Sequence, residues 1–206
     1  ILRELVRSLG MERVTLVGSS LGAAFAQIVA LADPGLVSRL ILVDGGLFPM
    51  SRVNIGLLLM LVPGIAEKRY RSLAGDLDAA YASLMPYYAS LAGLPPEERE
   101  FLRERVGERV ASVSQMRASF SSFRSFAVWL FTRGRRSARL ARRLDIPTLY
   151  VWGGQDHIVP VEVGRAARAK HAGAQMAIIP GSGHLPHQET PEEFLRVIDQ
   201  PGTGSH

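Results

Sequence analysis

The sequence predicts an α/β fold with a mostly parallel sheet, whose strands alternate with helices and are interrupted by a helical insertion. Two observations predict it. Short apolar runs at 14–18, 39–43, 148–152 and 175–179 show little polar alternation, which is typical of parallel strands buried on both faces. The long middle of the chain, in contrast, contains helical patterns but no run with the character of a strand.

The elements before the insertion follow one another closely. Residues 1–9 carry apolar side chains at helical spacing, and Gly10 ends that pattern. The strand at 14–18 leads directly into a helix of small residues at 21–31, which Asp33-Pro34-Gly35 terminates. The strand at 39–43 comes next. We therefore expect residues 1–47 to form the first piece of a core.

The composition changes after Gly46, and the next segment is predicted to be a helical cap at 48–143. Glycines and prolines divide it into helices. These are expected at about 52–62, 66–74, 76–92, 96–112, 114–132 and 135–144.

The core is predicted to resume at 144–206. A strand at 148–152, a helix near 161–171 and a strand at 175–179 are followed by a last helix. Pro191, Glu192 and Glu193 give that helix a proline in its first turn and early acidic residues, both of which favour a helix start. The domain prediction is therefore core, cap, core.

Composition and charge exclude some classes of function. The 206 residues contain no cysteine, so disulfides, thiolate catalysis and cysteine–zinc sites are ruled out. The net charge is +5, and twelve arginines lie between Arg99 and Arg143. Without interleaved aromatics or a nucleic-acid motif, we interpret these arginines as solvated helix faces and expect no nucleic-acid partner. The apolar run at 55–62 is far shorter than the ~20 residues that cross a bilayer, so no stable membrane insertion is expected.

The strongest functional signal is Gly18-Ser19-Ser20-Leu21-Gly22, a G-x-S-x-G pattern between a strand and a helix. A sharp strand-to-helix turn at this pattern exposes the hydroxyl of its central serine, and the N–H of the following residue points at the group that the serine attacks. Ser20 is therefore the candidate nucleophile. The backbone N–H of Leu21 is the candidate oxyanion donor. A helix N-cap role for Ser20 is the structural alternative.

The last third of the sequence supplies a candidate acid and a candidate base. Asp156 follows the strand at 148–152, and His184 ends a glycine-rich loop after the strand at 175–179. The carboxyl ends of parallel strands meet at one edge of a sheet, so both side chains are expected near Ser20. Asp44 is an alternative acid and His187 an alternative base. His184 and His187 as a metal pair is disfavoured, because no carboxylate cluster accompanies them.

These motifs resemble the α/β-hydrolase superfamily, in particular members with a helical cap inserted mid-chain. The matching stretches are VTLVGSSLG, LILVDGG at 40–46, IPTLYVWGGQDHIVP at 146–160 and IIPGSGHLPHQETPEEF at 178–194. The order serine, aspartate, histidine is also the order of this superfamily. The resemblance implies Ser20 as nucleophile, His184 as general base and Asp156 as its partner, with Leu21 giving one oxyanion amide.

The resemblance also implies strands that precede the nucleophile strand in the family and that this sequence does not contain. In the family a loop from that region supplies the second oxyanion amide. We therefore expect a missing N-terminal segment of the same fold as a partner of this sheet. A homodimer is left open.

The predicted function is a serine hydrolase that cleaves carboxylic esters through an acyl-enzyme, without cofactor or metal. Its partner would be a small-molecule ester or related acyl substrate, and a cytoplasmic location is expected. The alternatives are a C–C bond hydrolase of aromatic degradation and a ligand receptor derived from a hydrolase. Candidate substrate-pocket residues are Ser19, Phe126, Trp129, Val159 and Leu185.

Overall fold

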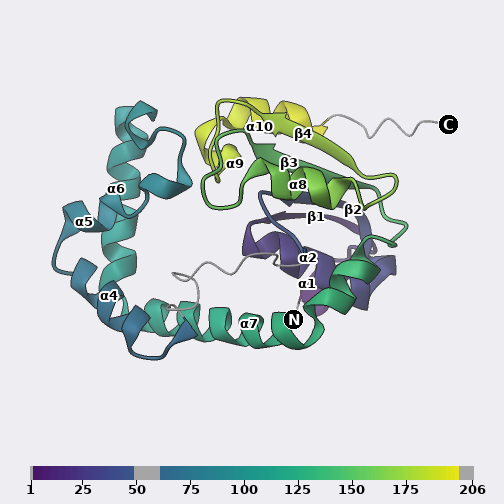
Figure 1. Cartoon of the computed structure of the whole chain (residues 1–206), viewed down its shortest axis with the longest axis horizontal. Helices are drawn as coiled ribbons and strands as arrows, with labels where there is room; N and C mark the ends of the chain where they lie inside the picture. The colour runs from purple at the N-terminus through teal and green to yellow at the C-terminus, as the bar shows by residue number, and fades with distance from the viewer. Residues whose placement is uncertain (1, 49–60, 200–206) are drawn as a thin grey trace. The chain divides into compact units, whose positions relative to one another are not determined.

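The computed structural model describes residues 2–48 and 61–199. These residues group as two compact units (Figure 1). The first unit takes its described residues from 2–48, 87–89 and 136–199, and the second from 61–86 and 90–135. The short stretch Tyr87–Ala89 thus belongs with the first unit, although it lies within the segment that the sequence predicts as cap.

A parallel sheet of four strands forms the centre of the first unit, as predicted (Figure 1). Its strands are β1 (Val14–Ser19), β2 (Val37–Val43), β3 (Thr148–Gly153) and β4 (Gln175–Ile179), in the spatial order β1-β2-β3-β4. All three pairs are parallel, with Val17 beside Ile41, Leu42 beside Tyr150 and Val151 beside Ala177. The carboxyl ends of all four strands therefore lie at the same edge of the sheet.

Helices cover both faces of this sheet. Alternate residues of a strand point to opposite faces, so Leu40, Leu42 and Trp152 belong to one apolar cluster and Ile41 and Val43 to the other. The first cluster includes side chains of α1 (Leu2–Ser8), α2 (Leu21–Ala32) and α8 (Val161–Arg168), and the second includes side chains of α10 (Pro191–Asp199). Burial on both faces explains why the strand sequences show so little polar alternation.

The second unit is helical in its described residues. It holds α4 (Ile65–Leu73), α5 (Leu77–Ala82), α6 (Pro96–Ala111) and most of α7 (Val113–Ala141). Val106 and Val110 of α6 pack against Ala80 of α5, and Phe120 and Met116 of α7 pack against Ala66 of α4. These small apolar clusters hold the helices together.

Two predicted helices have different bounds in the structure. The helix expected at 76–92 ends at Ala82, because Pro86 has no N–H to donate and its ring clashes with the preceding turn. The break expected at Gly134 does not occur, and α7 continues through it. A glycine inside a helix costs only about 1 kcal/mol, which the rest of a long helix can offset. The helix expected at 52–62 lies almost entirely outside the described residues.

The arginine-rich helices carry acidic partners on their surfaces. Arg124 pairs with Glu67 at 2.7 Å, Arg105 pairs with Glu108 at 2.8 Å, and Arg103 also pairs with an acidic residue of α5. The Arg103 and Arg105 side chains are exposed in these pairs, whereas those of Arg124 and Glu67 are partly buried. Within residues 2–48 and 61–199, none of the helices combines the length and the apolar character needed to cross a membrane.

Candidate active site

Ser20 occupies the turn between β1 and α2 in a strained backbone conformation. Its φ is 53° and its ψ is −116°, in the half of φ space that residues other than glycine rarely adopt. Such a conformation costs about 1–3 kcal/mol and persists where its surroundings impose it. The Ser20 N–H donates to the Val43 carbonyl at 2.8 Å, but its hydroxyl makes no capping hydrogen bond to α2. The helix does not use this hydroxyl.

Close backbone packing holds the Ser20 turn. A Cβ placed on Gly18 would lie 2.4 Å from the Gly22 carbonyl oxygen, and one placed on Gly45 would lie 2.1 Å from the Ser20 carbonyl oxygen. A Cβ on Gly22, in contrast, would meet no heavy atom within 4 Å. Gly18 and Gly45 are therefore the glycines that the turn requires.

Leu21 is the first residue of α2. The first N–H groups of a helix have no acceptor within the helix, and the helix dipole favours negative charge beside them. The position of Leu21 is thus compatible with the predicted role of its N–H as an oxyanion donor.

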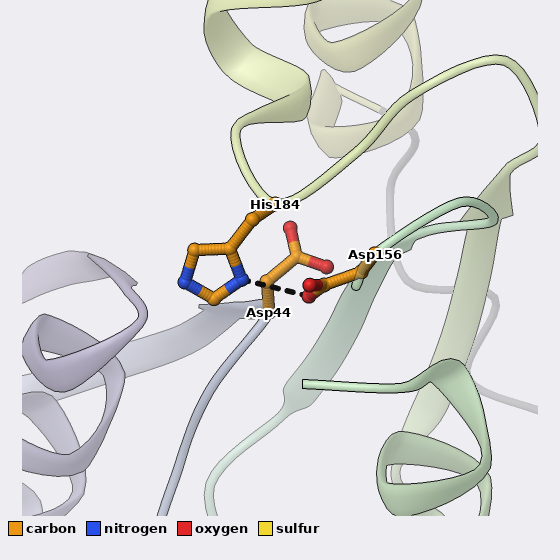
Figure 2. A group of neighbouring side chains, drawn as sticks. All are labelled: Asp44, Asp156 and His184. Carbon is orange, nitrogen blue, oxygen red and sulfur yellow. Dashed lines mark hydrogen bonds and ion pairs between the residues drawn. The ribbon is translucent and has the colours of Figure 1, made fainter. Parts of the chain in front are cut away.

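His184 and Asp156 form a buried pair (Figure 2). The distance from His184 Nδ1 to Asp156 Oδ2 is 2.7 Å, and both side chains are almost fully inaccessible to solvent. A carboxylate can only accept, so Nδ1 carries the proton and Nε2 is left as an acceptor. Asp156 Oδ1 accepts the N–H groups of Ile158 at 2.8 Å and Val159 at 2.9 Å. One oxygen of Asp156 is thus bonded to the imidazole, and the other is bonded to two backbone N–H groups.

His184 Nε2 is buried and has no hydrogen-bond partner among the residues that the structure describes. The structure thus joins His184 to Asp156, but it shows no hydrogen bond from Ser20 to the imidazole. Catalytic hydrogen bonds are often long before substrate binds and tighten in the complex. The predicted contact between Ser20 and His184 stays a prediction.

Asp44, the alternative acid, points toward the same pair (Figure 2). It is fully buried, its φ is 47°, and its Oδ1 accepts the Gly153 N–H at 2.8 Å. Burial raises the pKa of Asp44 to about 8, and the negative charge of Asp156 adds to this, whereas the Gly153 hydrogen bond acts in the opposite direction. At neutral pH Asp44 is therefore mostly protonated, and a neutral acid stabilises an imidazolium less than a carboxylate does.

We expect Asp44→Asn to remove a pH dependence of stability. An unfolded aspartate loses its proton near pH 3.8, whereas folded Asp44 keeps it up to about pH 8, so the folded state binds more protons in between. The free energy of unfolding of the parent then falls as pH rises across this interval. Asparagine keeps an oxygen for Gly153 but cannot ionise. Calorimetry at about pH 5 and about pH 9 should show the variant gaining stability relative to the parent, and a constant difference would contradict the assignment.

His187, the alternative base, has a different environment. It lies on the short helix α9 (Pro186–Glu189). The centroid of its ring is 5.8 Å from the centroid of the Phe194 ring in α10. Burial lowers the pKa of His187, and the neighbouring His184 lowers it further. In the structure the histidine bonded to a carboxylate is His184.

The predicted pocket residues lie in different structural surroundings. Ser19 ends β1, and its buried Oγ finds no hydrogen-bond partner within the described ranges. Val159 acts through its backbone, because its N–H donates to Asp156 and its carbonyl accepts the Trp152 Nε1–H at 2.8 Å. Leu185 directly follows His184. Phe126 and Trp129 stack on α7, with ring centroids 5.9 Å apart. A shared substrate pocket for these residues remains a prediction.

The expectation that no carboxylate cluster accompanies His184 was wrong, because the structure places two carboxyl groups beside it. Asp44, Asp156 and His184 each offer one ligand atom, and these atoms lie within 4.8 Å of one another. The nitrogen that faces the two carboxylates is Nδ1, which already bonds to Asp156. Nδ1 therefore belongs to the histidine–aspartate pair, beside which Asp44 is mostly protonated.

Two further parts of the site, Glu189 and the stretch Tyr87–Ala89, carry no recognisable signal in the sequence. The Glu189 carboxylate accepts the N–H groups of Gly183 and Ala89, and the Tyr87 carbonyl accepts the N–H of His184. Glu189 stands two residues before Pro191, where an acidic residue looks like part of a helix start. Tyr87–Ala89 lies far from the other motifs in the sequence, and its pattern carries no signal for this contact.

A hollow of about 460 Å³ lies elsewhere in the first unit and contains none of the predicted site residues. It is lined by residues around the amino ends of β1 and β2: Arg7, Gly10, Met11, Glu12, Asp33, Gly35 and Leu36. Ser20, Asp44, Asp156 and His184 all follow the carboxyl ends of strands, where ligands bind in open α/β sheets.

The fold and this site define an α/β protein with a serine at a strand-to-helix turn and a buried histidine–aspartate pair at the same edge of a parallel sheet. The sequence matches the Alpha/beta hydrolase family over residues 1–197. The chain belongs to that family, which confirms the resemblance and the fold class.

Relatives and solved structures of more than one activity resemble the chain. It is 31% identical to an uncharacterized protein of Mycobacterium tuberculosis (strain ATCC 25618 / H37Rv), over 97% of the chain and 58% of that protein. It is 29% identical to a 2-hydroxy-6-oxononadienedioate/2-hydroxy-6-oxononatrienedioate hydrolase of Paraburkholderia xenovorans (strain LB400), over 96% of the chain and 64% of that enzyme. The chain thus spans about three fifths of the length of these relatives.

Two solved structures have the same fold. A 2-hydroxy-6-oxo-6-phenylhexa-2,4-dienoate hydrolase from Rhodococcus sp. strain RHA1 matches with a TM-score of 0.74 and 18% identity, over 94% of this chain and 65% of that one. An esterase from Exiguobacterium antarcticum matches with a TM-score of 0.65 and 19% identity, over 96% and 69%.

Proposed function

We propose that the chain carries the catalytic residues of a serine hydrolase that cleaves carboxylic esters through an acyl-enzyme. The observation that supports this most is the buried His184–Asp156 pair, whose Nε2 is left without a partner among the described residues. Neighbouring contacts connect it with Ser20, since Gly45 packs on Ser20 and Asp44 lies beside the pair. Acyl transfer requires a hydroxyl that can act as nucleophile and an imidazole nitrogen that can accept its proton. The Ser20 hydroxyl, which does not cap its helix, and His184 Nε2 meet these requirements.

In the proposed mechanism, Ser20 Oγ attacks the ester carbonyl carbon while His184 Nε2 takes the hydroxyl proton. Asp156 holds the imidazole in the required tautomer and stabilises the imidazolium. The N–H of Leu21 donates to the developing oxyanion. The imidazolium then protonates the leaving alcohol, and a water molecule, activated by the same imidazole, hydrolyses the acyl-enzyme.

A fluorophosphonate probe tests this proposal directly. The reagent phosphonylates serines that an adjacent base activates, so we expect one adduct, located on Ser20 by mass spectrometry of the peptides. The measurement uses the protein at its natural length. An unlabelled Ser20 would contradict the hydrolase proposal and favour the receptor alternative.

A C–C bond hydrolase is the second candidate. The support for it is the identity of 29% with an enzyme named for a 2-hydroxy-6-oxo dienedioate substrate. The two candidates share the predicted triad and differ in the bond that is cleaved. A panel that contains p-nitrophenyl esters and a 2-hydroxy-6-oxo-dienoate, followed by absorbance, distinguishes them. The substrate with the larger kcat/KM identifies the activity.

The two histidines provide a matched pair of variants. We expect His184→Ala to lower kcat by about 10⁴-fold or more, because it removes the base. We expect His187→Ala to change kcat by less than about tenfold, since this ring packs on Phe194 and the histidine bonded to Asp156 is His184. Steady-state kinetics of both variants on the preferred substrate checks this. The reverse order of effects would move the base to His187.

A further inference from the structure

One carboxylate, that of Glu189, accepts hydrogen bonds from the loop that carries His184. Glu189 Oε2 accepts the Gly183 N–H at 2.5 Å and the Ser182 hydroxyl at 3.2 Å, and Oε1 accepts the Ala89 N–H at 2.6 Å. Glu189 therefore binds donors from two segments that are far apart in the sequence. Both segments belong to the first unit.

The same two segments are joined around His184 itself. The His184 N–H donates to the Tyr87 carbonyl at 2.8 Å, and the Tyr88 hydroxyl donates to Gln188 Oε1 at 2.6 Å. The centroid of the Tyr87 ring lies 5.9 Å from the centroid of the His184 imidazole. We refer to residues Tyr87–Ala89 as the strap.

Gly183 lies between two backbone segments. On one side, a Cβ added to Gly183 would lie 2.5 Å from the Ala89 nitrogen of the strap. On the other side, a Cβ added to Gly153 at the end of β3 would lie 1.8 Å from the Gly183 carbonyl oxygen. Backbone packing of this kind leaves the loop little freedom, provided that the strap stays in place.

We propose that Glu189 is a positioning residue that fixes the His184 imidazole by fastening its loop to the strap. This inference rests on the proposed function, because it concerns the base of that reaction. Hydrogen bonds to a carboxylate are about twice as strong as those between neutral groups. A displacement of about 1 Å at a catalytic group can cost about 10²-fold in rate. Glu189 thus acts on the reaction through His184 and not by touching the substrate.

Glutamine at position 189 has nearly the shape of glutamate but removes one acceptor. Its amide NH₂ would face an N–H donor where the carboxylate accepts now, so one of the two segments loses its hydrogen bond to residue 189. The matched control is Glu192→Gln, which removes the same charge at an exposed position in the first turn of α10.

The test compares kcat, KM and the Nδ1–H proton resonance of His184 in parent, E189Q and E192Q. We expect E189Q to lower kcat by about 10- to 100-fold with KM within about twofold, and to shift or broaden the strongly deshielded resonance that H184A removes. E192Q should match the parent. A parental kcat and resonance in folded E189Q would overturn the proposal. So would a rise in KM at constant kcat.

Two further measurements keep the outcomes distinct. If E189Q does not fold, S182A replaces it, because it removes one donor to Glu189 and leaves the backbone unchanged. It should lower kcat about threefold at constant KM, and a parental kcat would overturn the proposal. If the parent itself is not labelled on Ser20 by a fluorophosphonate, the proposed function fails. The proton resonance still decides whether Glu189 positions His184.

Discussion

Replacing Ser20 by alanine is expected to lower hydrolysis of the preferred substrate by about 10⁴- to 10⁶-fold while the fold persists. The variant removes the oxygen that we propose as the nucleophile. It removes no helix cap, since the Ser20 hydroxyl makes no capping hydrogen bond. The change in free energy of unfolding should therefore stay within about 0.5 kcal/mol. Progress curves at high enzyme concentration and thermal melting measure the two quantities.

The matched control is Ser121→Ala, the same substitution at an exposed position of α7. It should leave both activity and melting temperature at the parental values. Activity of the Ser20 variant within about tenfold of the parent would remove Ser20 from the mechanism. A large loss of stability together with activity would show that the serine has a structural role.

Gly18→Ala is expected to destabilise the first unit by about 3 kcal/mol, which is the cost of overpacking against atoms that cannot move aside. The added Cβ would lie 2.4 Å from the Gly22 carbonyl oxygen and 2.7 Å from the Ala23 Cα. Both are backbone atoms of the turn that presents Ser20. Relief would require β1 and α2 to separate, so activity should fall as well. Urea unfolding of parent and variant measures the difference in stability.

Gly22→Ala is the control for this prediction. The sequence pattern treats the two flanking glycines alike, but a Cβ on Gly22 meets no heavy atom within 4 Å. Alanine is also the better helix former, so this variant should be as stable as the parent or more stable by about 0.5 kcal/mol. Equal losses of stability for Gly18→Ala and Gly22→Ala would contradict the packing described for the turn.

The sheet could be predicted from the sequence because its physical basis is local. Each strand is covered on both faces, so each is an apolar run, and the structure places strands at all four predicted runs. The helical middle was less predictable. Pro86 ends a helix that was expected to continue, and α7 passes through Gly134, where a break was expected. The break at Pro86 has a local cause that the sequence does contain, its missing N–H, whereas the continuation through Gly134 depends on the rest of the long helix, which a linear pattern does not show.

The candidate site, like the fold, could be predicted from the sequence only in part. Ser20, Asp156 and His184 stand in motifs at strand ends, and the structure bonds the last two to each other. The sequence left Asp44 open as an alternative, because its burial and raised pKa are properties of the folded state. Glu189 could not be found at all, since its partners Gly183 and Ala89 are brought together only by folding.

The strap has a consequence for exchanging parts between members of the family. Residues 49–135 could be chosen as one segment to be replaced by the insertion of another hydrolase, in order to change substrate preference. Tyr87–Ala89 lies inside that segment, yet it provides the carbonyl that accepts from His184 and the N–H that donates to Glu189. A chimera designed by cutting at the two ends would also discard these contacts to the loop of the proposed base, His184. Grafts should therefore retain these three residues, or import a donor segment that carries an equivalent stretch.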